Sequence, residues 1–306
     1  MTTSRGWWRL VLGTTALAVL APGSLALAGF AFVGLMILGR PAASAGWVAM
    51  GIAAGGGVWL VKDASGTALD GLASAFAVCA ATAFVVEAAL RPTAFFRQAL
   101  RAVSWGLAGA VGLELVLQGG VPWGQLAWDA RREASWVARQ SLAATADTYS
   151  AFEPVVRVIS TALPAVLVLG ALAGLALAWE WHERLARQPL GAPLAAFREF
   201  RIADGWVWGL VGSGLVWVVP VLAAAKVAAL NVAIVLGVLY LLRGAAIVVA
   251  IASAIGVSNA ALAVGAAVAG VLAFPLLVVL PGLWALGVSD TWLEFRRRLA
   301  SRPNIS

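Results

Sequence analysis

The stretch Leu230–Ala250 reads LNVAIVLGVLYLLRGAAIVVA and contains a single charged residue, Arg243. It lies within the apolar run Val227–Ile255, which is longer than the roughly 20 residues that a helix needs to cross a bilayer. The run lacks the alternation of apolar and polar residues that is typical of a half-buried strand. It therefore predicts a membrane-embedded helix.

Runs of the same kind fill most of the chain, and short polar breaks separate them. Besides Val227–Ile255 they are Leu10–Gly39, Gly46–Val61, Ala68–Leu90, Val103–Leu117, Val155–Trp179, Trp206–Ala225 and Asn259–Leu286. The first run is too long for one crossing and contains Pro22-Gly23, so we expect a helical hairpin or a kinked pair there. The predicted fold class is all-α: a polytopic transmembrane helix bundle with eight or nine membrane segments.

The composition of the chain supports this prediction. Hydrophobic residues make up 62% of the 306 residues and charged residues 11%, and the mean hydropathy is +0.94. A soluble domain is nearer to half apolar and a quarter charged. No long polar segment interrupts the pattern, so we interpret residues 1–306 as one integral membrane domain.

Basic residues predict the orientation, because loops rich in Arg and Lys stay in the cytoplasm. They gather near the N-terminus, after Leu90, in residues 180–204 and in the tail 289–306, whereas residues 119–153 are net acidic. We expect a bacterial cytoplasmic (inner) membrane protein with a cytoplasmic loop, a cytoplasmic basic tail and both termini inside. That orientation requires an even number of crossings, which predicts that Val227–Ile255 is broken or re-entrant around Arg243-Gly244.

Residues 122–150 differ from the apolar runs and predict an external amphipathic helix. Trp128, Arg132 and Trp136 recur at four-residue spacing and so share one helix face. Leu126 and Ala130 belong to an apolar side. Such a helix either lies passively on the membrane surface or forms a lid over a cavity.

Polar groups inside apolar runs are costly and are therefore candidates for function. Glu114, Asn231, Tyr240 and Arg243 are the candidate ligand-binding residues. Two interpretations of Arg243 remain open. It forms a structural pair, with Glu114 or Asp204, or it faces an anionic ligand.

The sequence contains few of the residue patterns that are typical of enzymes or metal sites. Cys79 and His182 are the only residues of their kinds, which excludes most zinc sites and most histidine-based catalytic dyads. No phosphate-binding or dinucleotide-binding glycine motif occurs. We expect no catalytic residues, no metal, no cofactor and no enzymatic activity. The net charge of +7 does not indicate nucleic acid, because the arginines lie in short breaks beside apolar runs.

Three segments carry a resemblance to a known family. They are FREFRIADGWVWGL at Phe197–Leu210, the stretch Leu230–Ala250 quoted above, and LGVSDTWLEFRRRL at Leu286–Leu299. Together they resemble the YybS-like family of predicted bacterial membrane proteins, a domain of unknown function. Arg243 departs from the neutral polar residue that is expected before the glycine. The family is more distantly similar to the substrate-binding S subunits of energy-coupling-factor transporters, which implies binding of a small metabolite and docking on a separate energising module.

The charged residues around these segments are candidates for contact with partners or lipid. They are Arg201, Asp204, Asp290, Arg296, Arg297 and Arg298. Asp290 is also placed to cap a short helix that follows it. The best interpretation is a small-molecule-binding, transport-related subunit that contacts the lipid bilayer and other membrane proteins, with an unknown ligand. The alternative is a non-catalytic scaffold in a larger membrane complex.

Overall fold

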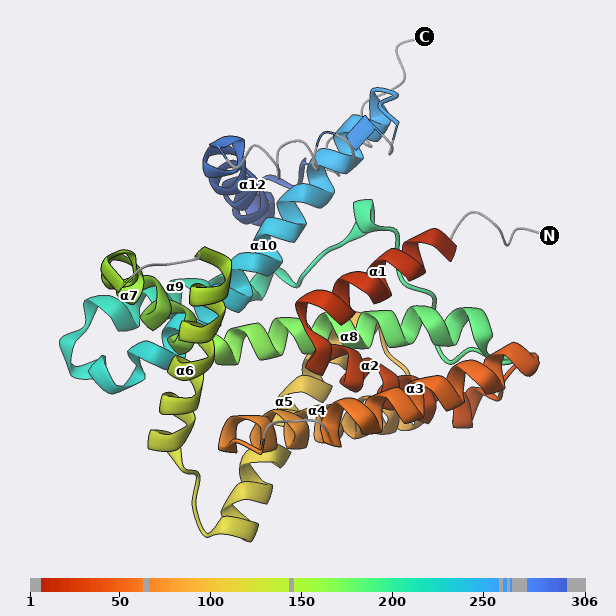
Figure 1. Cartoon of the computed structure of the whole chain (residues 1–306). Helices are drawn as coiled ribbons and strands as arrows, with labels where there is room; N and C mark the ends of the chain where they lie inside the picture. Colours follow the sequence, from red (N-terminus) through yellow and green to blue (C-terminus); the bar gives the residue numbers. More distant parts are fainter. Residues whose placement is uncertain are drawn as a thin grey trace. The chain divides into compact units, whose positions relative to one another are not determined.

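The computed structural model of the chain describes residues 7–62, 66–142, 146–258, 261–262, 265 and 274–295. Every regular element within these residues is a helix, apart from one isolated β-bridge between Pro41 and Ala186 (Figure 1). The chain divides into two compact units, Met1–Leu194 and Ala195–Ser306.

Six helices in the described part of the chain are long and apolar enough to cross a membrane. They cover Pro22–Gly39, Ser44–Val61, Ala68–Leu90, Phe95–Leu117, Leu163–Leu185 and Pro220–Ala254, and shorter apolar helices cover Leu10–Val19 and Val278–Leu293. The predicted all-helical fold is therefore confirmed, and these helices are consistent with a multi-pass membrane protein. The predicted number of eight or nine segments is not established by these helices.

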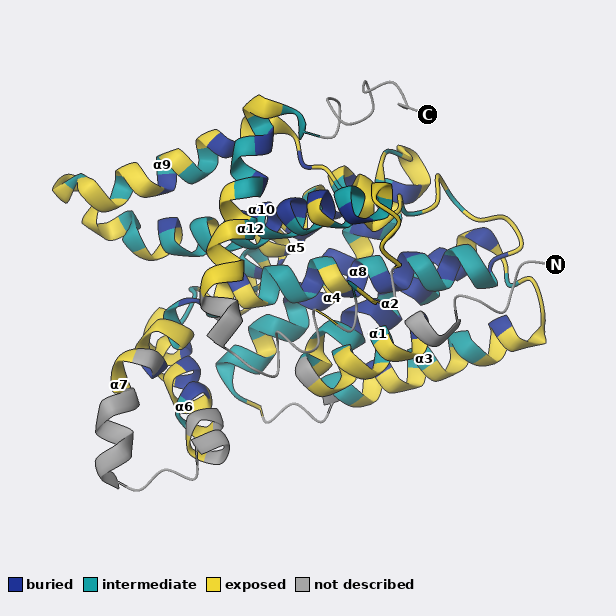
Figure 2. Cartoon of the chain, turned by 90° about the horizontal axis from the view of Figure 1, so that it is seen from above, coloured by how far each residue is buried: buried dark blue, intermediate teal, exposed yellow. Residues whose placement is uncertain are grey.

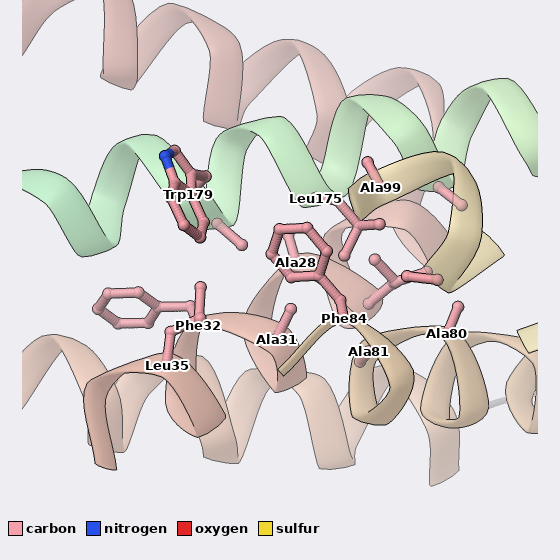
Figure 3. Close-up of a cluster of buried hydrophobic side chains, with 14 of the residues drawn as sticks. Ala28, Ala31, Phe32, Leu35, Ala80, Ala81, Phe84, Ala99, Leu175 and Trp179 are labelled. Carbon is pink, nitrogen blue, oxygen red and sulfur yellow. The ribbon is translucent and has the colours of Figure 1, made fainter. Parts of the chain in front are cut away.

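The first unit has α2 and α4 at its centre. Its helices are α1 (Trp7–Leu20), α2 (Pro22–Gly39), α3 (Ser44–Lys62), α4 (Ala68–Leu90), α5 (Phe95–Gln118), α6 (Trp123–Leu142), α7 (Ala146–Thr161) and α8 (Leu163–Leu185). Pro22 begins α2, so the predicted division of the first apolar run is confirmed. The core joins Phe32 of α2, Phe84 of α4 and Trp179 of α8, with the rings of Phe84 and Trp179 5.8 Å apart edge to face (Figure 3).

Small residues allow these helices to approach closely. A Cβ added to Gly106 of α5 would lie 2.7 Å from the Cα of Ala80 in α4. Gly174 of α8 likewise abuts the carbonyl oxygen of Ser24 in α2. Gly112, by contrast, faces open space. Close packing in a bilayer depends on such contacts, because lipid tails are as apolar as the helix surfaces.

The outer helices expose apolar side chains as a lipid-facing surface does. On α3, Ile52 is 70% exposed and Trp59 is 62% exposed. Figure 2 shows α3 largely exposed, whereas much of α2 is buried. Soluble monomers rarely expose contiguous apolar surface on this scale. The unit is therefore built for a hydrocarbon environment.

The amphipathic segment forms α6 and α7 rather than one helix over residues 122–150. The shared face is present, since the guanidinium of Arg132 lies 5.1 Å from the centre of the Trp128 ring. Leu126 and Ala130 are buried on the other side, as predicted. The Oδ2 atom of Asp129, also buried, accepts a hydrogen bond from the backbone N–H of Leu69 at 3.3 Å. This bond attaches α6 to the first turn of α4.

The run Val155–Trp179 was expected to be one helix, but α7 ends at Thr161 and α8 begins at Leu163. Pro164 occupies the first turn of α8. Proline has no backbone N–H and clashes with the preceding turn, which explains the interruption.

The second unit contains η1 (Phe197–Glu199), η2 (Asp204–Trp206), α9 (Val207–Val218), η3 (Pro220–Ala225), α10 (Lys226–Ala254) and α12 (Phe274–Leu293). Both α9 and α12 pack on α10, and Figure 1 shows α12 beside α10. The predicted break around Arg243-Gly244 is wrong, because α10 is one continuous helix of 29 residues. A glycine inside a helix costs only about 1 kcal/mol, whereas proline costs about 3 kcal/mol. The helical chain is accordingly interrupted at Pro220, between α9 and α10.

Candidate functional site

The candidate site is a group of polar residues in the second unit, which we call the Arg243 cluster. It consists of Asp204 in η2, Tyr240 and Arg243 in α10, and Asp290 and Thr291 in α12. Tyr240 and Arg243 are three residues apart and so lie on the same face of α10. Four of the five residues were singled out from the sequence, and Thr291 was not.

Two glycines bring α10 and α12 together beside the cluster. A Cβ added to Gly244 would overlap the carbonyl oxygen of Leu283, and one added to Gly287 would overlap that of Tyr240. The two backbones are therefore in direct contact at this crossing. Asp290 lies three residues beyond Gly287, about one helical turn away, which places its carboxylate within reach of α10.

The guanidinium of Arg243 is fully buried and joins three elements. Its Nε donates to Oδ2 of Asp290 at 2.9 Å. Its Nη1 donates to Oδ1 of Asp204 at 2.8 Å and to the hydroxyl of Thr291 at 3.5 Å. These bonds connect η2, α10 and α12 around one cation. Charge-assisted hydrogen bonds of this kind are about twice as strong as neutral ones.

The two aspartates differ in environment. Asp290 is 2% exposed, and its second oxygen accepts the backbone N–H of Phe295 at 3.0 Å. Asp204 is 53% exposed. The side chain of Asp290 thus faces the interior, whereas Asp204 lies where the cluster meets the surface of its unit. Two ionised carboxylates around one guanidinium would carry a net charge of −1.

Two buried hydrogen-bond donors in the cluster have no partner among the described residues. They are Nη2 of Arg243 and the hydroxyl of Tyr240, and both side chains have zero exposure. The Thr291 side chain lies close enough to the Tyr240 hydroxyl to act on it as a hydrogen-bond partner, and the charges of Arg243 and Asp204 also act on it, but no contact to the hydroxyl has good hydrogen-bond geometry. More than nine in ten buried polar groups in native proteins are paired, so unpaired donors in one cluster need an explanation.

The remaining predicted residues are not members of the Arg243 cluster. Glu114 belongs to α5 in the first unit. Asn231 lies twelve residues before Arg243 on α10, about 18 Å along the helix axis, and its amide donates to the carbonyl of Val227 at 2.8 Å. Arg201 is exposed. Arg296, Arg297 and Arg298 lie outside the described residues.

Asp290 does not occupy the capping position that the sequence predicted. It is inside α12, which continues to Leu293, so the helix does not begin after it. The chain turns at Glu294, whose φ is +45°. The Asp290 carboxylate does accept the backbone N–H of Phe295, which lies beyond that turn and is again helical, so it links the end of α12 to the residue that follows the turn.

The single histidine has a structural role in the first unit. Nε2 of the buried His182 accepts the backbone N–H of Leu190 at 3.0 Å, and Nε1 of Trp179 donates to the carbonyl of Ala192 at 3.2 Å. These bonds attach Leu190 and Ala192, which follow α8, to the side chains of that helix. Among the described residues no group of three or more His, Cys, Asp or Glu side chains is arranged to hold a metal ion.

Comparison with known proteins gives one family match. A family model described as "Predicted membrane protein (DUF2232)" matches residues 137–291, which is about half of the chain and includes all five residues of the Arg243 cluster. No curated protein and no solved structure matches the chain.

Proposed function

Because the chain belongs to the DUF2232 family of predicted membrane proteins, we propose that it is a transport-related membrane subunit that binds a small molecule at the Arg243 cluster. The matched segment ends at Thr291, the last residue of the cluster. The ligand is one that offers an acceptor oxygen to the guanidinium and to the tyrosine hydroxyl.

The unpaired donors carry this proposal. Nη2 of Arg243 and the hydroxyl of Tyr240 are both donors, they are three residues apart on one helix face, and neither is exposed. An unpaired buried polar group costs about 1–3 kcal/mol, and more if it is charged. A neutral acceptor oxygen of a bound molecule, such as a carbonyl oxygen, placed between them would remove that cost, and this supports a ligand site.

Asp204 supplies a route to the site. Its carboxylate contacts Arg243 on one side and is half exposed on the other, so solvent reaches the edge of the cluster. Small-molecule sites fix their ligands with a few convergent polar groups, and the Arg243 cluster offers such groups. Transport-related binding subunits need such a connection between the interior and the surface.

A specific observation also favours the scaffold alternative. The bonds from Arg243 to Asp204, Asp290 and Thr291 connect three elements, as a purely structural fastener would. Under that alternative the protein binds no small molecule, and its role is assembly with other membrane proteins. The two functions make different predictions about Tyr240, because its hydroxyl forms none of the three bonds that connect these elements.

Several finer expectations belong to this proposal. They are the YybS-like identity, the analogy with energy-coupling-factor S subunits, a separate energising partner, the absence of enzymatic activity, and the location in a bacterial inner membrane with both termini cytoplasmic. The arginines at 296–298 would then contact lipid or that partner. Six candidate membrane-spanning helices support the membrane part of this set.

The test compares the full-length protein with its Tyr240→Phe variant after purification in mild detergent. Small molecules released by denaturation are identified and quantified by mass spectrometry. We expect the wild type to release one compound in near-stoichiometric amounts and the variant to retain about tenfold less, the cost of one hydrogen bond to a charged or polar ligand. Tyr149→Phe, which removes the hydroxyl of the only other tyrosine, is the control and should retain the compound.

The scaffold alternative predicts no released compound from any of the three proteins. In that case Tyr240→Phe should also be more stable than the wild type, because it removes an unpaired buried hydroxyl. Equal retention of a compound by wild type and Tyr240→Phe would contradict the proposed site.

A further inference from the structure

A groove on the first unit runs between α4 and α5. It has a volume of about 450 Å³ and is lined by Val78, Cys79, Thr82, Ala83, Val86 and Glu87 of α4 and by Trp105 of α5. The α4 residues recur at spacings of three and four, so they form one stripe along the helix. Nearly all of the lining is apolar, and the single carboxylate lies at one end of the stripe.

The close contact of the two helices explains the groove. Gly106 and Gly109 of α5 lie against Ala80 and Cys79 of α4, so the backbones nearly touch there. Trp105 projects beside this contact and is 64% exposed. A large ring next to small residues leaves a hollow along the α4 surface. The hollow extends from Val78 to Glu87, about 14 Å along the axis, close to half the thickness of a hydrocarbon core.

Arg101 lies near the end of the groove that holds Glu87, and two more arginines, Arg97 and Arg91, are close in sequence to that end. Arg101 and Arg97 are one turn apart on α5, and Arg91 directly follows α4. All three are exposed. Glu87 supplies the carboxylate at this end of the groove. This end of the groove therefore has an excess of positive charge.

Arg101 is only loosely held by Glu87. The Nη1 and Oε2 atoms are 3.7 Å apart, which is longer than a hydrogen bond, and Oε2 of Glu87 has no hydrogen-bond partner among the described residues. The side chain of Arg101 is 46% exposed. Its guanidinium thus remains able to bind a second anion, and phosphate is the group that arginine binds bidentately.

We propose that this groove binds an anionic phospholipid, with one acyl chain along α4 and the headgroup phosphate on Arg101 and Arg97. Both helices are candidate membrane spans, so the groove between them lies at the depth of lipid chains in a bilayer. The apolar stripe matches an acyl chain in length, and the positive end matches the charge of the headgroup. Basic pockets beside membrane helices are known to select anionic lipids. The site lies in the first unit and is independent of the function proposed for the Arg243 cluster.

The test measures lipid retention by native mass spectrometry after transfer from nanodiscs that contain equal amounts of phosphatidylglycerol and phosphatidylcholine. We expect the full-length wild type to retain one phosphatidylglycerol in preference to phosphatidylcholine. Arg101→Gln should reduce that preference about fivefold, the effect of one basic residue near a charged headgroup. Arg198→Gln, which changes an exposed arginine paired with Glu199 in the second unit, is the matched control and should leave the preference unchanged.

Three further variants separate a lipid site from a structural role. Glu87→Gln removes the competing carboxylate and should increase retention of phosphatidylglycerol. If the ion pair were purely structural, both Glu87→Gln and Arg101→Gln would lower the stability of the protein and leave its preference between the two lipids unchanged. Ala83→Trp fills the groove and should abolish retention, whereas Ala89→Trp, at an exposed position of α4 outside the groove, should not.

Equal retention of the two lipids by the wild type would overturn the proposal. Retention of phosphatidylglycerol by Ala83→Trp at the wild-type level would overturn it as well. Detection of a second protein chain in place of lipid, released by Ala83→Trp, would show that the groove is a helix-docking surface and would also contradict it.

Discussion

The strongest quantitative prediction concerns the two aspartates that share Arg243. Their distances to the guanidinium are nearly equal, 2.9 Å for Asp290 and 2.8 Å for Asp204, but their exposures are 2% and 53%. Breaking a buried ion pair costs about 3–5 kcal/mol, because the remaining charge stays buried. An exposed pair contributes about 1 kcal/mol or less. Asp290→Asn should therefore reduce the free energy of unfolding by about 3 kcal/mol, and Asp204→Asn by about 1 kcal/mol.

The assay is equilibrium unfolding of each full-length variant in mixed detergent micelles, followed by circular dichroism. A further variant, Arg243→Met combined with Asp290→Leu, replaces the buried pair by apolar side chains and should recover most of the lost stability, because such replacements are often neutral. The reasoning is refuted if Asp204→Asn costs as much as Asp290→Asn, or if the double variant is less stable than Asp290→Asn alone.

Two further predictions concern glycines at helix crossings. Gly287→Ala in α12 should destabilise by about 1–3 kcal/mol, because the new methyl group would overlap the backbone of α10, whereas Gly282→Ala in the same helix, with open space around it, should be neutral in the same unfolding assay. In the first unit, Gly106→Ala should separate α5 from α4 and destabilise by a similar amount, with Gly112→Ala as the neutral control. If the glycine variant and its control had the same unfolding midpoint, in either helix pair, the glycine contact would contribute nothing to stability.

The sequence predicted the helices best where the physical signal was strongest. The predicted bounds Ala68–Leu90 match α4 to the residue, and in the structure Thr67 caps the start of the helix while polar residues follow its end. Pro22 was also identified correctly as a boundary. A bilayer requires every backbone group to be paired within a helix, which makes the apolar pattern a reliable guide.

The prediction of a break in α10 was wrong because it gave too much weight to the charge of Arg243. Arg243 was expected to break the helix, since an arginine in an apolar run is costly. The structure places carboxylates from η2 and α12 on that arginine, so the cost is met by tertiary contacts and the helix continues. Local sequence does not reveal which distant residues will supply such compensation.

The site was predicted only in part. Asp204 was one of two partners suggested for Arg243, and the structure pairs them. Asp290 was placed at a surface instead, because it is 47 residues away in sequence and stands next to a run of arginines. One available signal was the pair of glycines, Gly244 and Gly287, each close to a charged residue in an apolar helix. A close helix crossing at these glycines brings the two charges together.

The most direct test of the central claim is a high-resolution experimental structure of the purified protein in a lipid nanodisc, viewed at Arg243 and Tyr240. The account predicts density larger than a water molecule within hydrogen-bond distance of both Nη2 of Arg243 and the Tyr240 hydroxyl. A single water molecule there, or a direct bond from the Tyr240 hydroxyl to a neighbouring side chain, would contradict it.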